Sequence, residues 1–104
     1  MDTTVQIIPN ERTTPPGKLA DAELHFTGGP LDGLKLIGFA VWVRRDGNGR
    51  NVTFPARTFT VHGDRRSFAL LRAVDDPSAQ DRVRELVLEA YAEHERQAAG
   101  PAAS

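Results

Sequence analysis

Residues 34–54 read LKLIGFAVWVRRDGNGRNVTF and carry the strongest secondary-structure signal in the chain. The run 34–45 is rich in β-branched and aromatic residues and is the longest strand candidate. The run 46–49, Asp-Gly-Asn-Gly, follows it with residues that accept positive φ, and residues 50–54 return as an antiparallel strand. This stretch therefore predicts a β-hairpin at the centre of the fold.

Shorter strands are expected on both sides of this hairpin. Residues 22–27 alternate between apolar and polar side chains, and residues 58–62 and 67–74 are further extended candidates. Pro55 cannot donate to a β-ladder, so it should end a strand or lie at an edge or bulge. Together these segments predict a meander of consecutive antiparallel strands.

A C-terminal helix follows the strands. Asp76 suits the N-cap position and Pro77 suits the first helical position. Beyond them a stripe of residues recurs at spacings of three and four, and Leu88 lies outside it. The stripe consists of Ala79, Val83, Leu86, Val87, Ala90, Tyr91 and His94. The predicted fold class is α+β, an antiparallel β-meander of about four to five strands followed by one C-terminal amphipathic helix.

The composition indicates one compact domain, because the chain has 104 residues with 39% hydrophobic and 26% charged side chains. Residues 1–21 are expected to be a flexible or loosely packed N-terminal segment, although Val5–Ile8 could form a short edge strand. Residues 22–96 should form the single α+β domain. Residues 97–104, which contain Gly100 and Pro101, should be a disordered tail.

Both faces of the long strand candidate are apolar. In strict alternation, one face carries Leu34, Leu36, Gly38, Ala40 and Trp42, and the other carries Lys35, Ile37, Phe39, Val41 and Val43. One helix covers only one face of a sheet, so we expect a second copy of the chain to cover the other face in a homodimer. The alternative is that the N-terminal segment folds back over it.

Charge is distributed unevenly along the chain. The net charge is −1, but residues 44–72 carry seven basic and two acidic side chains, and both flanking segments are acidic. Guanidinium groups bind phosphate oxygens in bidentate geometry. The candidate nucleic-acid-binding residues are Arg44, Arg45, Arg50, Arg57, Arg65 and Arg66. The alternative is that these arginines are solvated surface residues that only keep the protein soluble.

Three residues have a second interpretation. Phe54 and Phe59 could stack on bases, but both are expected in the core. Arg57 could instead pair with an acid such as Asp46 or Asp64 and hold the edge of the sheet.

No catalytic constellation is present. The chain has no cysteine, its serines lie in no Gly-x-Ser-x-Gly turn, and its three histidines lie far apart without acidic partners at ligand spacing. We therefore expect no enzyme, no metal or cofactor site and no small-molecule substrate. The acidic N-terminus and the lack of a run of about 18 apolar residues predict a cytoplasmic protein that does not enter a membrane.

The run LKLIGFAVWV at 34–43, the glycine-rich turn and the run NVTFPAR at 51–57 resemble the core of the SpoVG family of small bacterial proteins. The segment 87–91, VLEAY, is similar to the Val-Leu-x-x-Tyr ending of that family's helix, and the resemblance covers roughly residues 22–95. It implies a cytoplasmic homodimer that binds DNA or RNA as a regulator. The family's basic DNA-contact motif, Ser-Lys-Arg, corresponds here to Ala56-Arg57, so the resemblance assigns a contact to Arg57 alone.

The expected function is that of a small dimeric nucleic-acid-binding regulator, with DNA preferred to RNA as the partner. The alternative is a protein-interaction or scaffolding module that uses an apolar sheet face and an acidic helix to bind another polypeptide.

Overall fold

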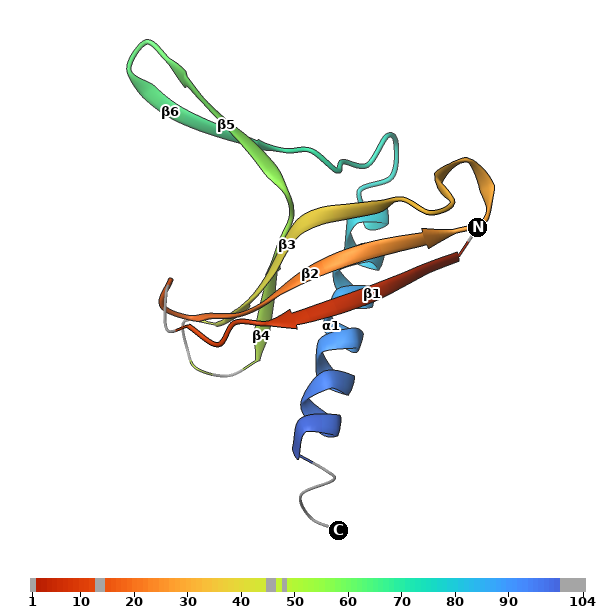
Figure 1. Ribbon diagram of the computed structural model, residues 1–104. Coiled ribbons are helices and arrows are strands. Elements are labelled where there is room, and N and C mark those ends of the chain that lie inside the picture. The colour runs from red at the N-terminus through yellow and green to blue at the C-terminus, as the bar shows by residue number, and fades with distance from the viewer. Residues whose placement is uncertain (1, 13–14, 45–46, 48, 100–104) are drawn as a thin grey trace.

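The computed structural model describes residues 2–12, 15–44, 47 and 49–99 of the chain. In chain order its elements are β1 (Asp2–Pro9), β2 (Lys18–Thr27), the 3-10 helix η1 (Gly29–Leu31), β3 (Lys35–Val43), β4 (Arg50–Thr53), β5 (Ala56–Val61), β6 (Asp64–Ala69) and α1 (Ser78–Ala99). Strands β1 to β4 form an antiparallel sheet in that order, and β5 and β6 form a separate two-stranded sheet (Figure 1). The predicted α+β meander with a C-terminal helix is confirmed.

Helix α1 packs across one face of the four-stranded sheet, and the core lies between them (Figure 1). Phe39, Val41 and Val87 are the largest fully buried side chains. Val87 and Tyr91 belong to the predicted helical stripe and are buried as expected. Leu88 also packs against the core, which the stripe did not predict, because α1 contacts both β1 and β4 and so buries a wider arc of its surface.

The start of α1 has the predicted capping residue. The Asp76 carboxylate accepts hydrogen bonds from the hydroxyl of Ser78 at 2.7 Å and from its backbone N–H at 3.0 Å. These two bonds lower the pKa of Asp76 below its ordinary value of 3.8. Pro77 precedes Ser78 at a position where the missing N–H leaves no helical hydrogen bond unmade. Over the residues that the structure describes, no helix combines the length and the apolar composition needed to cross a membrane.

Residues 1–21 were predicted to be flexible or loosely packed, and strand β1 corrects this prediction over residues 2–9. These residues are ordered because β1 pairs with β2 along its whole length. Val5 and Ile7 pack against the core, which supplies the partner that a short edge strand requires. At the other end of the chain, residues 97–99 belong to α1, and the remainder of the predicted tail, 100–104, lies outside the described residues.

A β-bulge in β3 makes the strict alternation predicted for this strand wrong. Two residues of β3, Ile37 and Gly38, are inserted opposite one residue of β2, where the register shifts. Gly38 has a φ of +107°, a conformation that residues with a Cβ rarely adopt. Beyond the bulge the faces are exchanged, so Leu36 packs on the core face together with Phe39 instead of on the opposite face.

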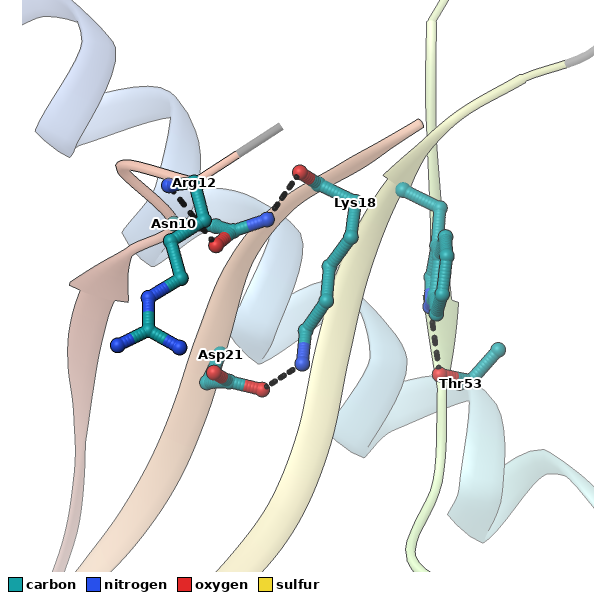
Figure 2. A network of polar contacts seen from close by, with 6 residues as sticks. Asn10, Arg12, Lys18, Asp21 and Thr53 are labelled. Carbon is teal, nitrogen blue, oxygen red and sulfur yellow. Dashed lines mark hydrogen bonds and ion pairs between the residues drawn. The ribbon is translucent and has the colours of Figure 1, made fainter. Parts of the chain in front are cut away.

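The face of the sheet opposite α1 is mostly polar. Figure 2 shows the ion pair between Lys18 and Asp21 at 2.6 Å and the Asn10 amide, which donates to the carbonyl oxygen of Lys18 at 3.0 Å. On the same face the Trp42 indole N–H donates to the hydroxyl of Thr53 at 2.8 Å. The described strands therefore lack the continuous second apolar face on which the homodimer was expected, and the homodimer stays a prediction.

Strands β5 and β6 form a hairpin that projects from the sheet (Figure 1). We call residues 56–69 the arm. Its two-residue turn consists of His62 and Gly63, whose φ values of 51° and 82° are both positive, as a tight hairpin requires. The strand predicted over 67–74 ends at Ala69. The radius of gyration is 15.6 Å, whereas a compact domain of this length has a radius of gyration of about 13 Å. The projecting arm contributes to the larger value.

The base of the arm is fixed at Pro55, which is buried. The backbone N–H of Leu70 donates to the carbonyl oxygen of Pro55 at 2.8 Å and closes the base. Pro55 packs so closely on Gly38 that a Cβ on Gly38 would lie 2.8 Å from the Pro55 Cβ. The bulge glycine therefore makes room for the chain to leave the sheet here, and it sets where the arm begins.

Candidate nucleic-acid interface

The arm presents two arginines and two phenylalanines on one face. Arg57 lies opposite Phe68, and Phe59 lies opposite Arg66. Residues directly opposite one another, and residues two apart on one strand, point to the same side of a sheet. The four side chains therefore share one face, where each strand carries one arginine and one phenylalanine. We call these four residues the arm face.

Both rings of the arm face are accessible. Phe59 is 39% exposed and Phe68 is 38% exposed, and their centroids lie 5.6 Å apart in a T-shaped contact. The prediction that Phe59 lies in the core is wrong, because no second layer of the described chain covers the two-stranded arm. Phe54 does pack against the core, as expected, and the centroid of its ring lies 5.1 Å from that of the Phe39 ring.

The arginines of the arm have no acidic partners in the described part of the chain, where no ion pair joins Arg57, Arg65 or Arg66 to a carboxylate. Asp64, one of the acids considered as a partner of Arg57, pairs with Val61 beside the turn, on the same side of the arm as Arg57, and forms no ion pair with it in the described structure. The other, Asp46, lies outside the described residues. The guanidinium groups of the arm are therefore free to bind an anion.

Arg72 extends the arm face toward the helix. It belongs to the segment 70–77, which connects β6 to α1, and its guanidinium carbon lies 5.5 Å from the centroid of the Phe68 ring. This distance is within the range of a cation–π contact. Phe68 and Arg72 are not among the site residues predicted from the sequence. The basic block 44–72 contains both, but nothing in it shows that they meet.

The remaining candidate arginines lie elsewhere. Arg65 belongs to the arm but pairs with Thr60 on the face opposite the arm face. Arg44 follows β3, and its backbone N–H donates to the carbonyl oxygen of Gly49 at the start of β4, whereas the arm begins beyond the other end of β4. Arg45 lies outside the described residues. Of the six predicted arginines, the structure brings Arg57 and Arg66 together on one face.

Arg50 has a role within the fold. Its guanidinium donates to the Glu95 carboxylate of α1 at 2.9 Å and lies 6.0 Å from the centroid of the Tyr91 ring. The hydrogen bond to Glu95 raises the pKa of Arg50. Burial raises the pKa of the Tyr91 hydroxyl. Arg50 therefore joins the edge strand β4 to the helix, and we leave it out of the interface.

A comparison of the chain with protein-family models, with characterised proteins and with solved structures finds no significant match. The resemblance to the SpoVG family therefore stays a prediction from the quoted motifs. The geometry itself offers an exposed surface of arginine and phenylalanine at the outer end of the molecule.

Proposed function

We propose that the chain is a regulatory protein that binds nucleic acid, DNA in preference to RNA, through the arm face. The observation that carries this proposal is the alternation, on one face of the arm, of accessible phenylalanine rings with arginines that form no ion pair within the described part of the chain. Guanidinium groups bind phosphate oxygens, and phenyl rings stack on bases. Surfaces that bind single-stranded nucleic acid combine these two kinds of side chain.

The charge of the rest of the chain supports binding at the arm. Residues 73–104, which include α1, carry seven acidic and three basic side chains. A polyanion is attracted by the arm and repelled by the acidic part of the chain. This asymmetry orients a nucleic acid on a protein whose net charge is close to zero.

The residue types on the arm face also limit its specificity. Phenyl rings have no donors or acceptors for reading base edges, and phosphate contacts carry no sequence information. We therefore expect a weak sequence preference and a strong dependence of affinity on salt. A cytoplasmic location and a homodimer, in which two arms would double the number of phosphate contacts, are parts of the proposal.

Fluorescence anisotropy of a labelled oligonucleotide, titrated with protein at several salt concentrations, tests the proposal. The double variant Arg57→Ala/Arg66→Ala should bind more weakly, and the slope of log K against log salt should fall by about 1.4 for a single strand. The double variant Arg65→Ala/Arg82→Ala removes the same number of positive charges at positions outside the arm face. Its affinity and its salt slope should therefore fall less. Absent binding at low salt, or an equal loss in both variants, overturns the proposal.

A pull-down with and without nuclease separates this function from that of a protein-interaction module. Partners that are held through nucleic acid should disappear after nuclease treatment. Partners that remain bound after nuclease treatment, in a protein that fails the anisotropy test, would show the protein-interaction alternative instead.

A further inference from the structure

A pocket of about 100 Å³ opens at the base of the arm, beside the first turns of α1. Its walls are formed mainly by apolar side chains. They include Phe54, Leu71, Ala73, Ala79 and Val83. An open apolar pocket of this kind favours a flat ring or another small apolar group over a charged one.

Arg72 connects this pocket to the arm face. The same side chain lines the pocket and lies over the ring of Phe68, with its guanidinium carbon 5.5 Å from the centroid. A phosphate bound by Arg72 would therefore lie between the pocket and the arm face. Because one side chain borders both surfaces, the pocket and the arm face lie next to each other.

We infer that the pocket holds one unstacked base of a single-stranded nucleic acid whose backbone continues along the arm face. This inference rests on the proposed function and names the form of nucleic acid that the site takes. A closed apolar cavity of about 150 Å³ in a protein holds a benzene ring. The present pocket is smaller but open, so it receives a one-ring pyrimidine more completely than a two-ring purine.

Gln80 belongs to the wall of the pocket beside Leu71. Its amide nitrogen donates to the carbonyl oxygen of Leu71 at 3.1 Å, which holds one wall in place. The surface that lines the pocket is almost entirely apolar, so the pocket contacts a ring without a polar group of its own. A base can enter the pocket only when it is unstacked and unpaired, as in a single strand.

Three labelled probes of equal length test the inference in the anisotropy assay: an oligothymidylate strand, an abasic deoxyribose-phosphate strand and a duplex. The variant Ala79→Leu places a larger side chain in the pocket and keeps a strong helix former at that position. Ala73→Leu fills the pocket from the connecting segment, in case the first variant does not fold. Ala98→Leu makes the same change at an exposed position near the end of α1 and is the matched control.

We expect the unaltered protein to bind oligothymidylate more tightly than the abasic strand and the duplex. A pocket-filling variant that stays folded should lose about five- to 150-fold in affinity for oligothymidylate. It should bind the abasic strand as before, because the abasic strand has no base to place in the pocket. Ala98→Leu should change neither affinity.

Two other outcomes overturn the inference, and they are distinguishable. If the folded pocket variants bind oligothymidylate like the unaltered protein, the pocket holds no base, while the proposed function of the arm face stands. If the unaltered protein binds none of the three probes at low salt, the proposed function fails and the inference fails with it.

Discussion

Phe59→Ala and Arg57→Ala should weaken nucleic-acid binding in two different ways. The Phe59 ring is 39% exposed on the arm face and offers one stacking surface. Stacking of one base on one aromatic side chain is worth about 1–3 kcal/mol, so Phe59→Ala should raise Kd about five- to 150-fold. The ring carries no charge, and the plot of log K against log salt should therefore shift without changing its slope.

Arg57→Ala should instead change the slope. Arg57 is exposed and unpaired within the described chain, so it can release about one phosphate's counterion when it binds. The slope should fall by about 0.7 for a single strand. Anisotropy titrations of both variants over about 50 to 200 mM salt measure the two effects on one scale.

Thr58→Ala is the control for both variants, because Thr58 lies on the same strand but pairs with Ser67 on the other face of the arm. It should leave affinity and slope unchanged. A thermal melt of each preparation shows whether the fold is retained. A folded Phe59→Ala variant that binds like the unaltered protein, or whose salt slope falls as much as that of Arg57→Ala, would refute a stacking role for Phe59.

Gly38→Ala should lower the free energy of unfolding by about 1–3 kcal/mol, because alanine is strained at a φ of +107° and its Cβ would meet Pro55; an unchanged urea midpoint would contradict this. Arg50→Ala should cost at most about 1 kcal/mol through loss of the Glu95 ion pair and should leave the salt slope of nucleic-acid binding unchanged; a reduced slope would return Arg50 to the interface. Asp76→Ala should lower the urea midpoint at neutral pH. The pKa of Asp76 is lowered in the fold, so the stability that its carboxylate adds is lost as the pH falls below 3.8. The difference in urea midpoint between the variant and the unaltered protein should therefore be smaller below pH 3.8 than at neutral pH. An equal difference in midpoint at the two pH values would argue against the cap.

The helix and the central hairpin could be predicted because their signals are local. Asp76 and Pro77 mark the start of α1 by capping chemistry that needs only the adjacent backbone. Residues 34–54 combine two β-rich runs with a turn that accepts positive φ, and β3 pairs with β4 as expected. Signals of this kind require no knowledge of the rest of the fold.

The faces of β3 and the exposure of the arm depend on distant parts of the chain. Gly38 within a strand run is compatible with a bulge, but its close contact with Pro55 depends on where the chain leaves the sheet. Phe59 stands among residues typical of a strand, and only the absence of a covering layer makes it accessible. The charge block located Arg57 and Arg66, whereas the meeting of Phe68 with Arg72 could be seen only in three dimensions.

The arm also divides the molecule into parts of unequal local stability. Every residue of β5 and β6 is exposed except Val61 and Ala69, which are half-buried, and an isolated two-stranded hairpin is marginally stable in water. Amide hydrogens of the arm should therefore exchange with solvent through small local openings, whereas those of β2 and β3 should exchange only on global unfolding. A bound nucleic-acid strand requires the hairpin to be ordered, so part of the interaction free energy offsets the cost of ordering it. Protection of the arm amides from hydrogen exchange would therefore report the fraction of protein that is bound.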